Sequence, residues 1–188
     1  MFQLPQSGSQ TRFQPISAIG DPSFSHSSRH DVLMACASDL AEPWAGFHTK
    51  QRRRGKAMHC IDISRKILKD TPTLSFAHYI MAISSHHLGD NTAMHRHILL
   101  SQRFGQFEGW LAERRFILFA NLIPAATEKN LTTDIATLLG TQPGTELLTK
   151  YFLARPELRP MIKATTNRAS TGDQQRFLNL IRRRGSSL

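Results

Sequence analysis

Apolar side chains recur every three or four residues through the middle of this chain. The clearest stripe consists of Phe76, Tyr79, Ile80 and Ile83, and a similar stripe runs through residues 57–70. This spacing places the apolar side chains on one face of an α-helix. No segment shows the strict apolar–polar alternation of a half-buried strand. The pattern therefore predicts an all-α fold.

Proline, glycine and aspartate residues mark the ends of the first predicted helices. Pro72 ends one helix, and Thr73 is the expected N-cap of the next. Gly89 stops that second helix, because glycine adopts a left-handed conformation with little strain. Asp90 is expected to cap a third helix that continues to Phe104. The chain should therefore reverse direction at the Gly-Asp pair.

Further helices are predicted after residue 107. The first of these, from Glu108 to Leu122, is apolar around much of its circumference, so we expect it in the middle of the fold. The others are expected at 132–140, capped from the Thr132–Asp134 segment, at 145–155 after a Pro143–Gly144 turn, at 156–168, and from residue 171, where Thr171–Gln174 has capping-box spacing.

The chain before residue 57 has a different composition. Residues 1–29 are rich in serine and contain several prolines and glycines, which predicts a disordered arm, with an organelle-targeting segment as the alternative. Residues 30–56 are expected to contain a short helix at 31–40 followed by a basic linker. An all-helical domain should then span residues 57–184.

Three features of residues 57–123 resemble a known family of helical repeats. The stretch Cys60–Pro72 looks like the second helix of a repeat that runs into a terminal proline. Gly89 stands where such a repeat places its turn glycine, and Ala82 stands at the small position where two helices approach closely. In these features the chain resembles a tetratricopeptide-type repeat.

The resemblance implies a short solenoid of stacked antiparallel helical hairpins, with an irregular helical bundle as the alternative. Proteins of this type usually hold another protein or a peptide. The implied function is a non-catalytic adaptor or scaffold that binds its partner in a groove between helix pairs. The implied groove residues are His78, Tyr79 and Ser85, although His78 and Ser85 stand where the family often has tryptophan and tyrosine.

The charge of the chain points to an acidic partner. Twenty-four Lys and Arg residues outnumber 14 Asp and Glu residues, which gives a formal net charge of +10. Arg114 and Arg115 lie on an otherwise apolar helix, so they are further candidates for partner contact, unless they snorkel to the surface. Two basic clusters are candidates for phosphate contacts, which makes a nucleic-acid-associated protein the alternative function. These clusters are Lys50, Arg52, Arg53, Arg54 and Lys56, and Arg182, Arg183 and Arg184.

Four histidines, His86, His87, His95 and His97, flank the predicted turn. Histidines one or two residues apart on a helix point in different directions, so neither pair presents both rings to one ion. We expect His87 and His97 to pack inside the fold and His86 and His95 to face solvent, with no metal and no cofactor. No phosphate-binding glycine loop, GxSxG or HExxH motif occurs, so we do not expect an enzyme; an enzyme would need polar groups that converge in one deep pocket.

The two cysteines, Cys36 and Cys60, lie at apolar positions without CxxC spacing. We expect both to be buried thiols rather than a disulfide, which fits a reducing compartment and a cytoplasmic protein. No apolar run is long enough to span a bilayer. The sequence indicates neither the identity of the partner nor the oligomeric state.

Overall fold

The computed structural model describes residues 25–41, 50–122 and 128–185. Within these ranges the chain forms helices and turns and no strand, which confirms the all-α prediction. Most of the predicted N-terminal arm, residues 1–24, lies outside the described residues. The helices are α1 (His26–Ala41), α2 (Lys50–Asp70), α3 (Ser75–Leu88), α4 (Asn91–Phe104), α5 (Gly109–Leu122), α6 (Glu128–Leu139), α7 (Gln142–Ala154), α8 (Arg159–Thr166) and α9 (Thr171–Gly185), with a 3₁₀ turn η3 (Pro156–Leu158) before α8.

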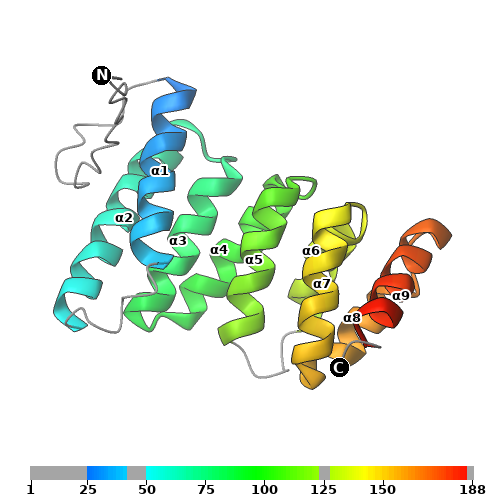
Figure 1. Ribbon diagram of the computed structural model, residues 1–188. Coiled ribbons are helices and arrows are strands. Elements are labelled where there is room, and N and C mark those ends of the chain that lie inside the picture. Colours follow the sequence, from blue (N-terminus) through cyan, green and yellow to red (C-terminus); the bar gives the residue numbers. More distant parts are fainter. Residues whose placement is uncertain (1–24, 42–49, 123–127, 186–188) are drawn as a thin grey trace, which may run out of the picture.

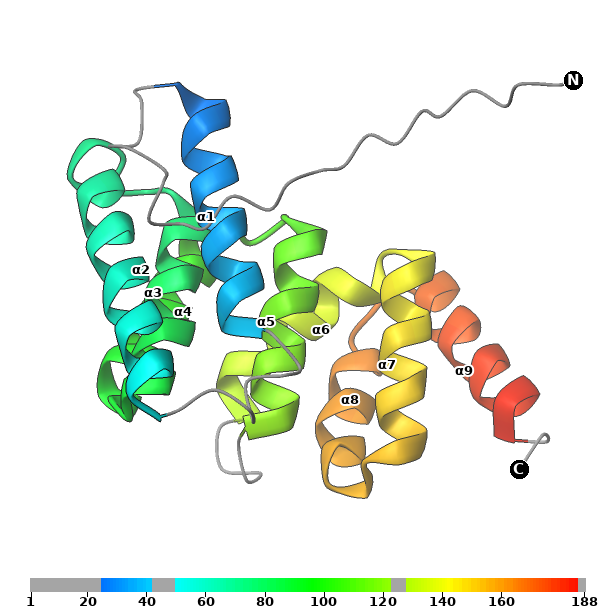
Figure 2. The ribbon, with the colours of Figure 1, turned by 60° about the vertical axis from the view of Figure 1, so that its left-hand side comes forward.

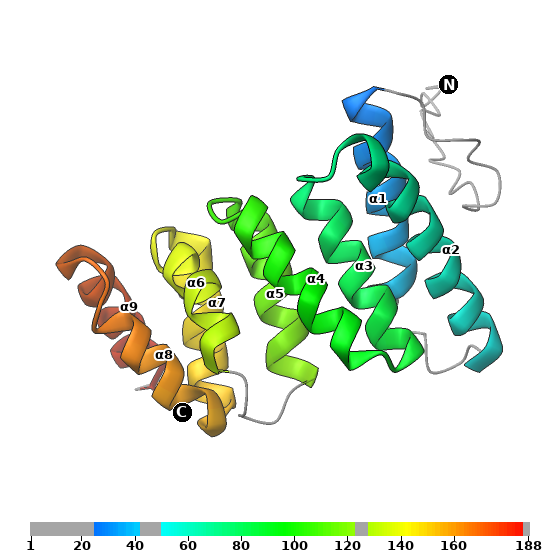
Figure 3. The same cartoon turned by 180° about the vertical axis from the view of Figure 1, so that it is seen from behind.

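Consecutive helices form antiparallel hairpins that stand side by side in a row from α1 to α9 (Figure 1). Helices α5 and α7 face the viewer in Figure 1, whereas α4, α6 and α8 face the viewer from behind in Figure 3, so the row has two layers. Successive hairpins are in contact, because α1 packs on α3, α4 on α6, and α6 on α8. The predicted stack of helical hairpins is therefore present.

Helix α3 lies at the centre of the N-terminal half. It packs against α1, α2, α4 and α5, and Figure 2 shows α1 alongside this group. Every residue from Ser75 to Ser85 is buried. At the start of the helix, the Phe76 ring meets the Trp110 ring of α5 edge-on, with 4.9 Å between the ring centroids. Helix α3, rather than the apolar α5, is thus the most enclosed helix of this half.

The turn between α3 and α4 has the predicted chemistry. Gly89 has φ +82°, which lies in the left-handed region that glycine adopts without strain. The Asp90 carboxylate caps α4 by accepting a hydrogen bond from the Ala93 backbone N–H, at 2.8 Å.

Helix α2 ends at Asp70, just before Pro72, as predicted from the sequence. Thr73, however, is not the cap of α3, because the cap position is occupied by Leu74, which makes no side-chain cap bond.

Two predicted helix starts in the C-terminal half are wrong by three or four residues, whereas α9 begins at Thr171 as predicted. Thr132–Asp134 lies inside α6, because the Asp134 carboxylate pairs with a buried arginine instead of a helix end. The Pro143–Gly144 pair belongs to the first turn of α7, where proline fits because that N–H needs no partner. Thr141 is the actual cap of α7, and Ser170 rather than Thr171 caps α9, through its hydroxyl oxygen.

Helices α1 and α2 correct three further predictions. Helix α1 begins at His26, and the basic run at residues 50–56 forms the first two turns of α2 rather than a linker. Cys36 of α1 and Cys60 of α2 are joined by a disulfide, so the expectation of two separate thiols is wrong. The two cysteines meet because their helices pack side by side with both residues fully buried. None of the helices in the described ranges is long and apolar enough to cross a membrane.

Candidate partner-binding site

Three predicted groove residues, His78, Tyr79 and Ser85, lie in the core. All three belong to α3, and each exposes less than a tenth of its surface. They do not line a groove, because α1, α2, α4 and α5 all pack on α3. Burial raises the pKa of Tyr79 to about 12, against the opposing effect of Arg114 and Arg115. These three residues therefore stabilise the fold and do not form a binding surface.

His78 and His97 form a buried pair that joins α3 to α4. Their Nδ1 atoms are 3.2 Å apart, and His78 Nε2 lies 3.0 Å from the Pro72 carbonyl oxygen. On the other side, Arg96 Nη2 lies 3.4 Å from His97 Nε2. The Phe104 ring stacks on His78 with 5.6 Å between centroids. Burial lowers the pKa of both histidines, and His78 and Arg96 help to lower that of His97 to about 4.

Arg115 is also buried, which contradicts its prediction as a partner contact. Its guanidinium donates to Asp134 Oδ1 from Nε, at 2.9 Å, and from Nη2, at 2.7 Å. The remaining donors reach the Ser101 hydroxyl and carbonyl and the Gly105 carbonyl at 3.2–3.4 Å. Gln102 Nε2 donates to the second Asp134 oxygen at 2.8 Å. The arginine thus connects α4, α5 and α6.

Asp134 is the neutralising partner of this network. Its side chain and that of Arg115 both have an exposed fraction of 0%. Burial raises the pKa of the Asp134 carboxyl, and the hydrogen bonds from Arg115 and Gln102 act against that rise. A buried charge is tolerated only when it is paired and hydrogen-bonded, and both conditions hold here. This network is a structural element, not an exposed binding surface.

Arg114 is the one predicted partner residue among the five that reaches the surface. It is half-buried, and its guanidinium carbon lies 5.8 Å from the centroid of the Trp110 ring. The arginine therefore lies over an aromatic ring that also packs on Phe76. The predicted snorkelling describes Arg114 and fails for Arg115.

The other histidines near the turn have local structural partners. His87 Nε2 lies 3.1 Å from the Leu40 carbonyl oxygen of α1, so its predicted packing is present. His86 contacts His87 edge-on, and His95 contacts the Phe119 ring. Both are half-buried, so they face solvent in part. In the part of the chain that the structure describes, no three His, Cys, Asp or Glu side chains are placed to hold a metal ion.

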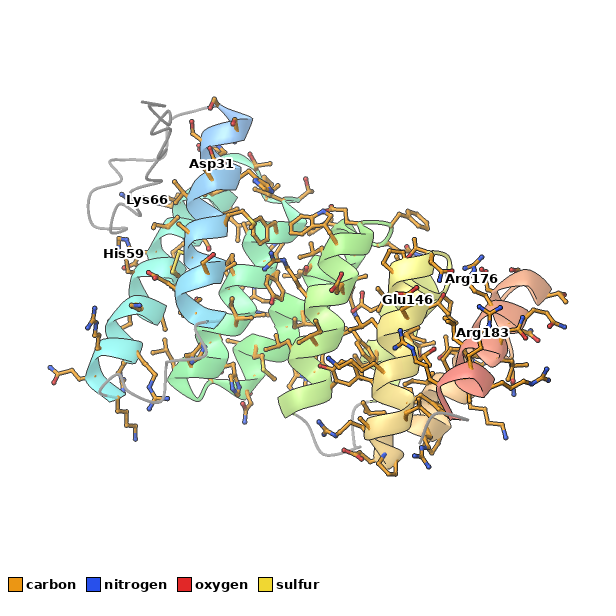
Figure 4. All side chains as sticks on the ribbon, viewed as in Figure 1. Asp31, His59, Lys66, Glu146, Arg176 and Arg183 are labelled. Atoms are coloured by element: carbon orange, nitrogen blue, oxygen red, sulfur yellow. A yellow bond between two sulfur atoms is a disulfide. The ribbon has the colours of Figure 1, made fainter. Side chains whose placement is uncertain are left out.

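The two basic clusters lie at opposite ends of the row. The α2 basic cluster (Lys50, Arg52, Arg53, Arg54, Lys56) occupies the start of a helix whose first turn has no acidic residue. Lys56 pairs with Asp39 of α1 at 3.3 Å. The other cluster, 182–184, occupies the last turn of α9, where the helix dipole favours cations. Figure 4 labels Arg183 at this end and Lys66 of α2 at the other, so the clusters do not form one surface.

An open hollow next to the α4–α5 turn was not predicted. Its volume is about 640 Å³, and we call it the Phe107 hollow. Phe107 stands at its edge with 86% of its surface exposed, the highest fraction among the large apolar residues that the structure describes. None of the lining side chains is charged. They belong to Gln106, Phe107, Gly109, Thr132, Thr133, Ala136, Thr137, Gly140 and Thr141.

The turn that carries Phe107 is fixed from several sides. The Gly105 N–H donates to the Ser101 carbonyl at 2.9 Å, while the Gly105 carbonyl accepts from Arg115. Ser75 of α3 donates to the Glu108 carboxylate at 2.6 Å. From α6, the Thr137 hydroxyl donates to the Gln106 carbonyl at 2.9 Å. Phe107 is therefore held in the exposed position by its neighbours.

The sequence contained a partial signal for this site. Phe107 is an aromatic residue in the short interval between two predicted helices, where a core side chain is not expected. On α6, small residues recur near helical spacing from Thr132 to Gly140 and leave space beside the turn.

A scan against protein-family models, a search of curated proteins and a search of solved structures each gave no match for this chain.

Proposed function

We propose that this chain is a non-catalytic adaptor that binds an uncharged, apolar segment of a partner protein at the Phe107 hollow. The observation that carries the proposal is the exposure of Phe107, at 86%, beside an open hollow of about 640 Å³. The turn around Phe107 is rigidly bonded, so the ring does not become exposed through a loose loop. Aromatic residues presented in this way are the typical anchors of protein interfaces.

The chemistry of the hollow defines the partner segment. Burying a phenylalanine side chain contributes roughly 1.5–3 kcal/mol, which is enough to anchor a contact. Since none of the lining residues carries a charge, the hollow itself does not select an acidic segment. The acidic partner predicted from the net charge would make its ionic contacts outside the hollow.

The arrangement of the helices supports the same function. The hollow lies between α6 and the α4–α5 turn, which joins the α3–α4 hairpin to the α5–α6 hairpin, and this position suits a groove between helix pairs. A row of antiparallel hairpins resembles the tetratricopeptide-type arrays, which usually bind proteins. The predicted cytoplasmic location loses its support, however, because a buried disulfide such as Cys36–Cys60 is typical of oxidising compartments.

The test of this proposal compares Phe107→Ser with Met58→Ser. Met58 is an apolar residue on α2 with 52% exposure, so its replacement is a matched control for a surface change outside the hollow. Proteins captured from an extract by the wild type would be purified, and their Kd values for the wild type and for both variants measured. We expect Phe107→Ser to weaken binding by about 30-fold, the equivalent of about 2 kcal/mol at an interface anchor. Equal binding by both variants would refute the proposal.

Polyanion binding by the α2 basic cluster is a second candidate function. Five cations lie in the first two turns of α2, where the positive end of the helix dipole disfavours them. The first turn of this helix has no acidic residue. Retention on heparin or RNA should then fall steeply between about 50 and 200 mM salt. Replacing Arg52, Arg53 and Arg54 with Gln should flatten this dependence, whereas the same change at residues 182–184 should have a smaller effect.

A further inference from the structure

The His78–His97 pair lies next to the turn that presents Phe107. Phe104, the last residue of α4, stacks on His78, and Gly105 follows it as the first residue of the turn. Ser75, three residues before His78 on α3, donates to Glu108 at the other end of the turn. The contact between α3 and α4 at this histidine pair therefore supports the turn directly.

The hydrogen bonds of the pair require both rings to be neutral. The Pro72 carbonyl can only accept, so His78 carries its proton on Nε2 and its Nδ1 accepts. His97 must then donate from Nδ1, which leaves its Nε2 as the acceptor that faces the Arg96 guanidinium. A second proton on His78 would place two N–H groups face to face across the 3.2 Å contact, unless His97 moved its own proton to Nε2, where that N–H would face the Arg96 guanidinium. A second proton on His97 would point an N–H at Arg96.

The charged groups around the pair do not remove this conflict. Arg96, on α4 itself, disfavours a positive charge on His97. Asp90, in the α3–α4 turn, favours that charge, but its effect on the ring is weaker than those of His78 and Arg96. From the α2–α3 turn only the Pro72 carbonyl faces His78. Arg115 of α5, on the far side of the α4–α5 turn, is neutralised by Asp134 of α6.

We propose that His78 and His97 form a proton-controlled latch, whose opening in mild acid loosens the α4–α5 turn and releases the partner from the Phe107 hollow. The release step rests on the proposed function, whereas the opening of the latch is a property of the chain alone. The closed latch binds no additional proton, and the open latch exposes two imidazoles that each take up one. Acid therefore favours the open state by mass action.

The direction and size of the effect follow from His97. Its pKa is about 4 in the closed state, against about 6.5 for a free histidine, so the closed state is fully favoured above pH 6.5 and loses that advantage as the pH falls toward 4. For this group alone, lowering the pH to about 5 shifts the equilibrium toward the open state by about 30-fold. The lowered pKa of His78 acts in the same direction.

Amide hydrogen exchange of residues 100–110, measured by mass spectrometry at about pH 7.5 and about pH 5 and corrected for intrinsic rates, tests the latch without a partner. In wild type we expect opening of this segment to increase by about 30-fold at the lower pH. His97→Asn keeps an amide N–H near the position of Nδ1 but does not titrate, so it should lose most of this increase. His95→Asn, on the same helix but outside the pair, should keep it.

The latch would be refuted if the exchange of residues 100–110 in wild type did not change with pH, or if His97→Asn and wild type showed an equal pH response. If His97→Asn does not fold, the NMR titration of the His97 ring in wild type decides, because a latch residue must titrate well below pH 6.5 and in step with the exchange of 100–110. Partner binding that is insensitive to Phe107→Ser, together with a normal exchange response, would refute the binding site and leave the latch in place.

Discussion

The Arg115–Asp134 pair is the contact whose removal should damage the fold most. Arg115→Met removes the guanidinium and leaves the fully buried Asp134 carboxylate with the hydrogen bond from Gln102 but without its counter-charge. Loss of one partner from a buried pair destabilises a protein by roughly 3–5 kcal/mol. Domains of this size are stable by about 5–15 kcal/mol, so the variant should lose a large share of its stability. Asp134→Leu should cost a similar amount, because it leaves the guanidinium buried without its counter-charge.

Urea unfolding followed by far-UV circular dichroism measures these losses. The matched control is Arg65→Met, because Arg65 pairs with Asp62 at 3.0 Å but both side chains are more than 60% exposed. Such an exposed pair contributes at most about 1 kcal/mol. The Arg115→Met/Asp134→Leu double variant should be more stable than the sum of the single losses predicts, by about 2 kcal/mol or more, since neither charge remains. Equal losses for Arg115→Met and Arg65→Met would refute the reasoning.

Three other changes test separate features of the fold. Replacing Cys36 and Cys60 with Ala should lower the free energy of unfolding by about 3 kcal/mol in urea, because the disulfide closes a loop of 24 residues; no change would show that the bond does not restrain the unfolded chain. Gly89→Ala should cost about 1 kcal/mol by the same assay, because φ there is +82°, and a neutral effect would contradict that backbone. Gly144→Ala should cost about 1–3 kcal/mol and lower Tm, since a Cβ would stand 2.3 Å from the Leu138 carbonyl oxygen; an unchanged Tm would contradict that approach.

Local features of the fold were predicted well from the sequence. The α3–α4 turn depends on Gly89 and Asp90, which satisfy the backbone within a few residues of their own positions. The end of α2 is likewise determined by a nearby residue, Pro72. In the C-terminal half, the Thr132–Asp134 segment has residue types suited to a cap, but a partner on another helix determines the place of Asp134. Sequence spacing alone does not reveal such a partner.

The candidate site depends on contacts between distant residues, so the sequence predicted little of it. Arg115 looked like a surface cation because its partner, Asp134, is 19 residues away on another helix. His78 and Tyr79 looked like groove residues because the periodicity of α3 does not show that four other helices pack on it. The place of Phe107 between two predicted helices is only a partial signal for its exposure, since the turn is held by residues of α3, α5 and α6.

The disulfide between α1 and α2 has a consequence for how the row of hairpins comes apart. In a linear array, disassembly usually begins by fraying at either terminus, where a unit has only one neighbour. Here a disulfide joins the two helices of the N-terminal unit, whereas α9 packs on α6, α7 and α8 with no covalent cross-link among the described residues. Heat, pulling force or a protease should therefore disrupt α9 first, and unfolding should proceed from the C-terminal end of the row toward α1.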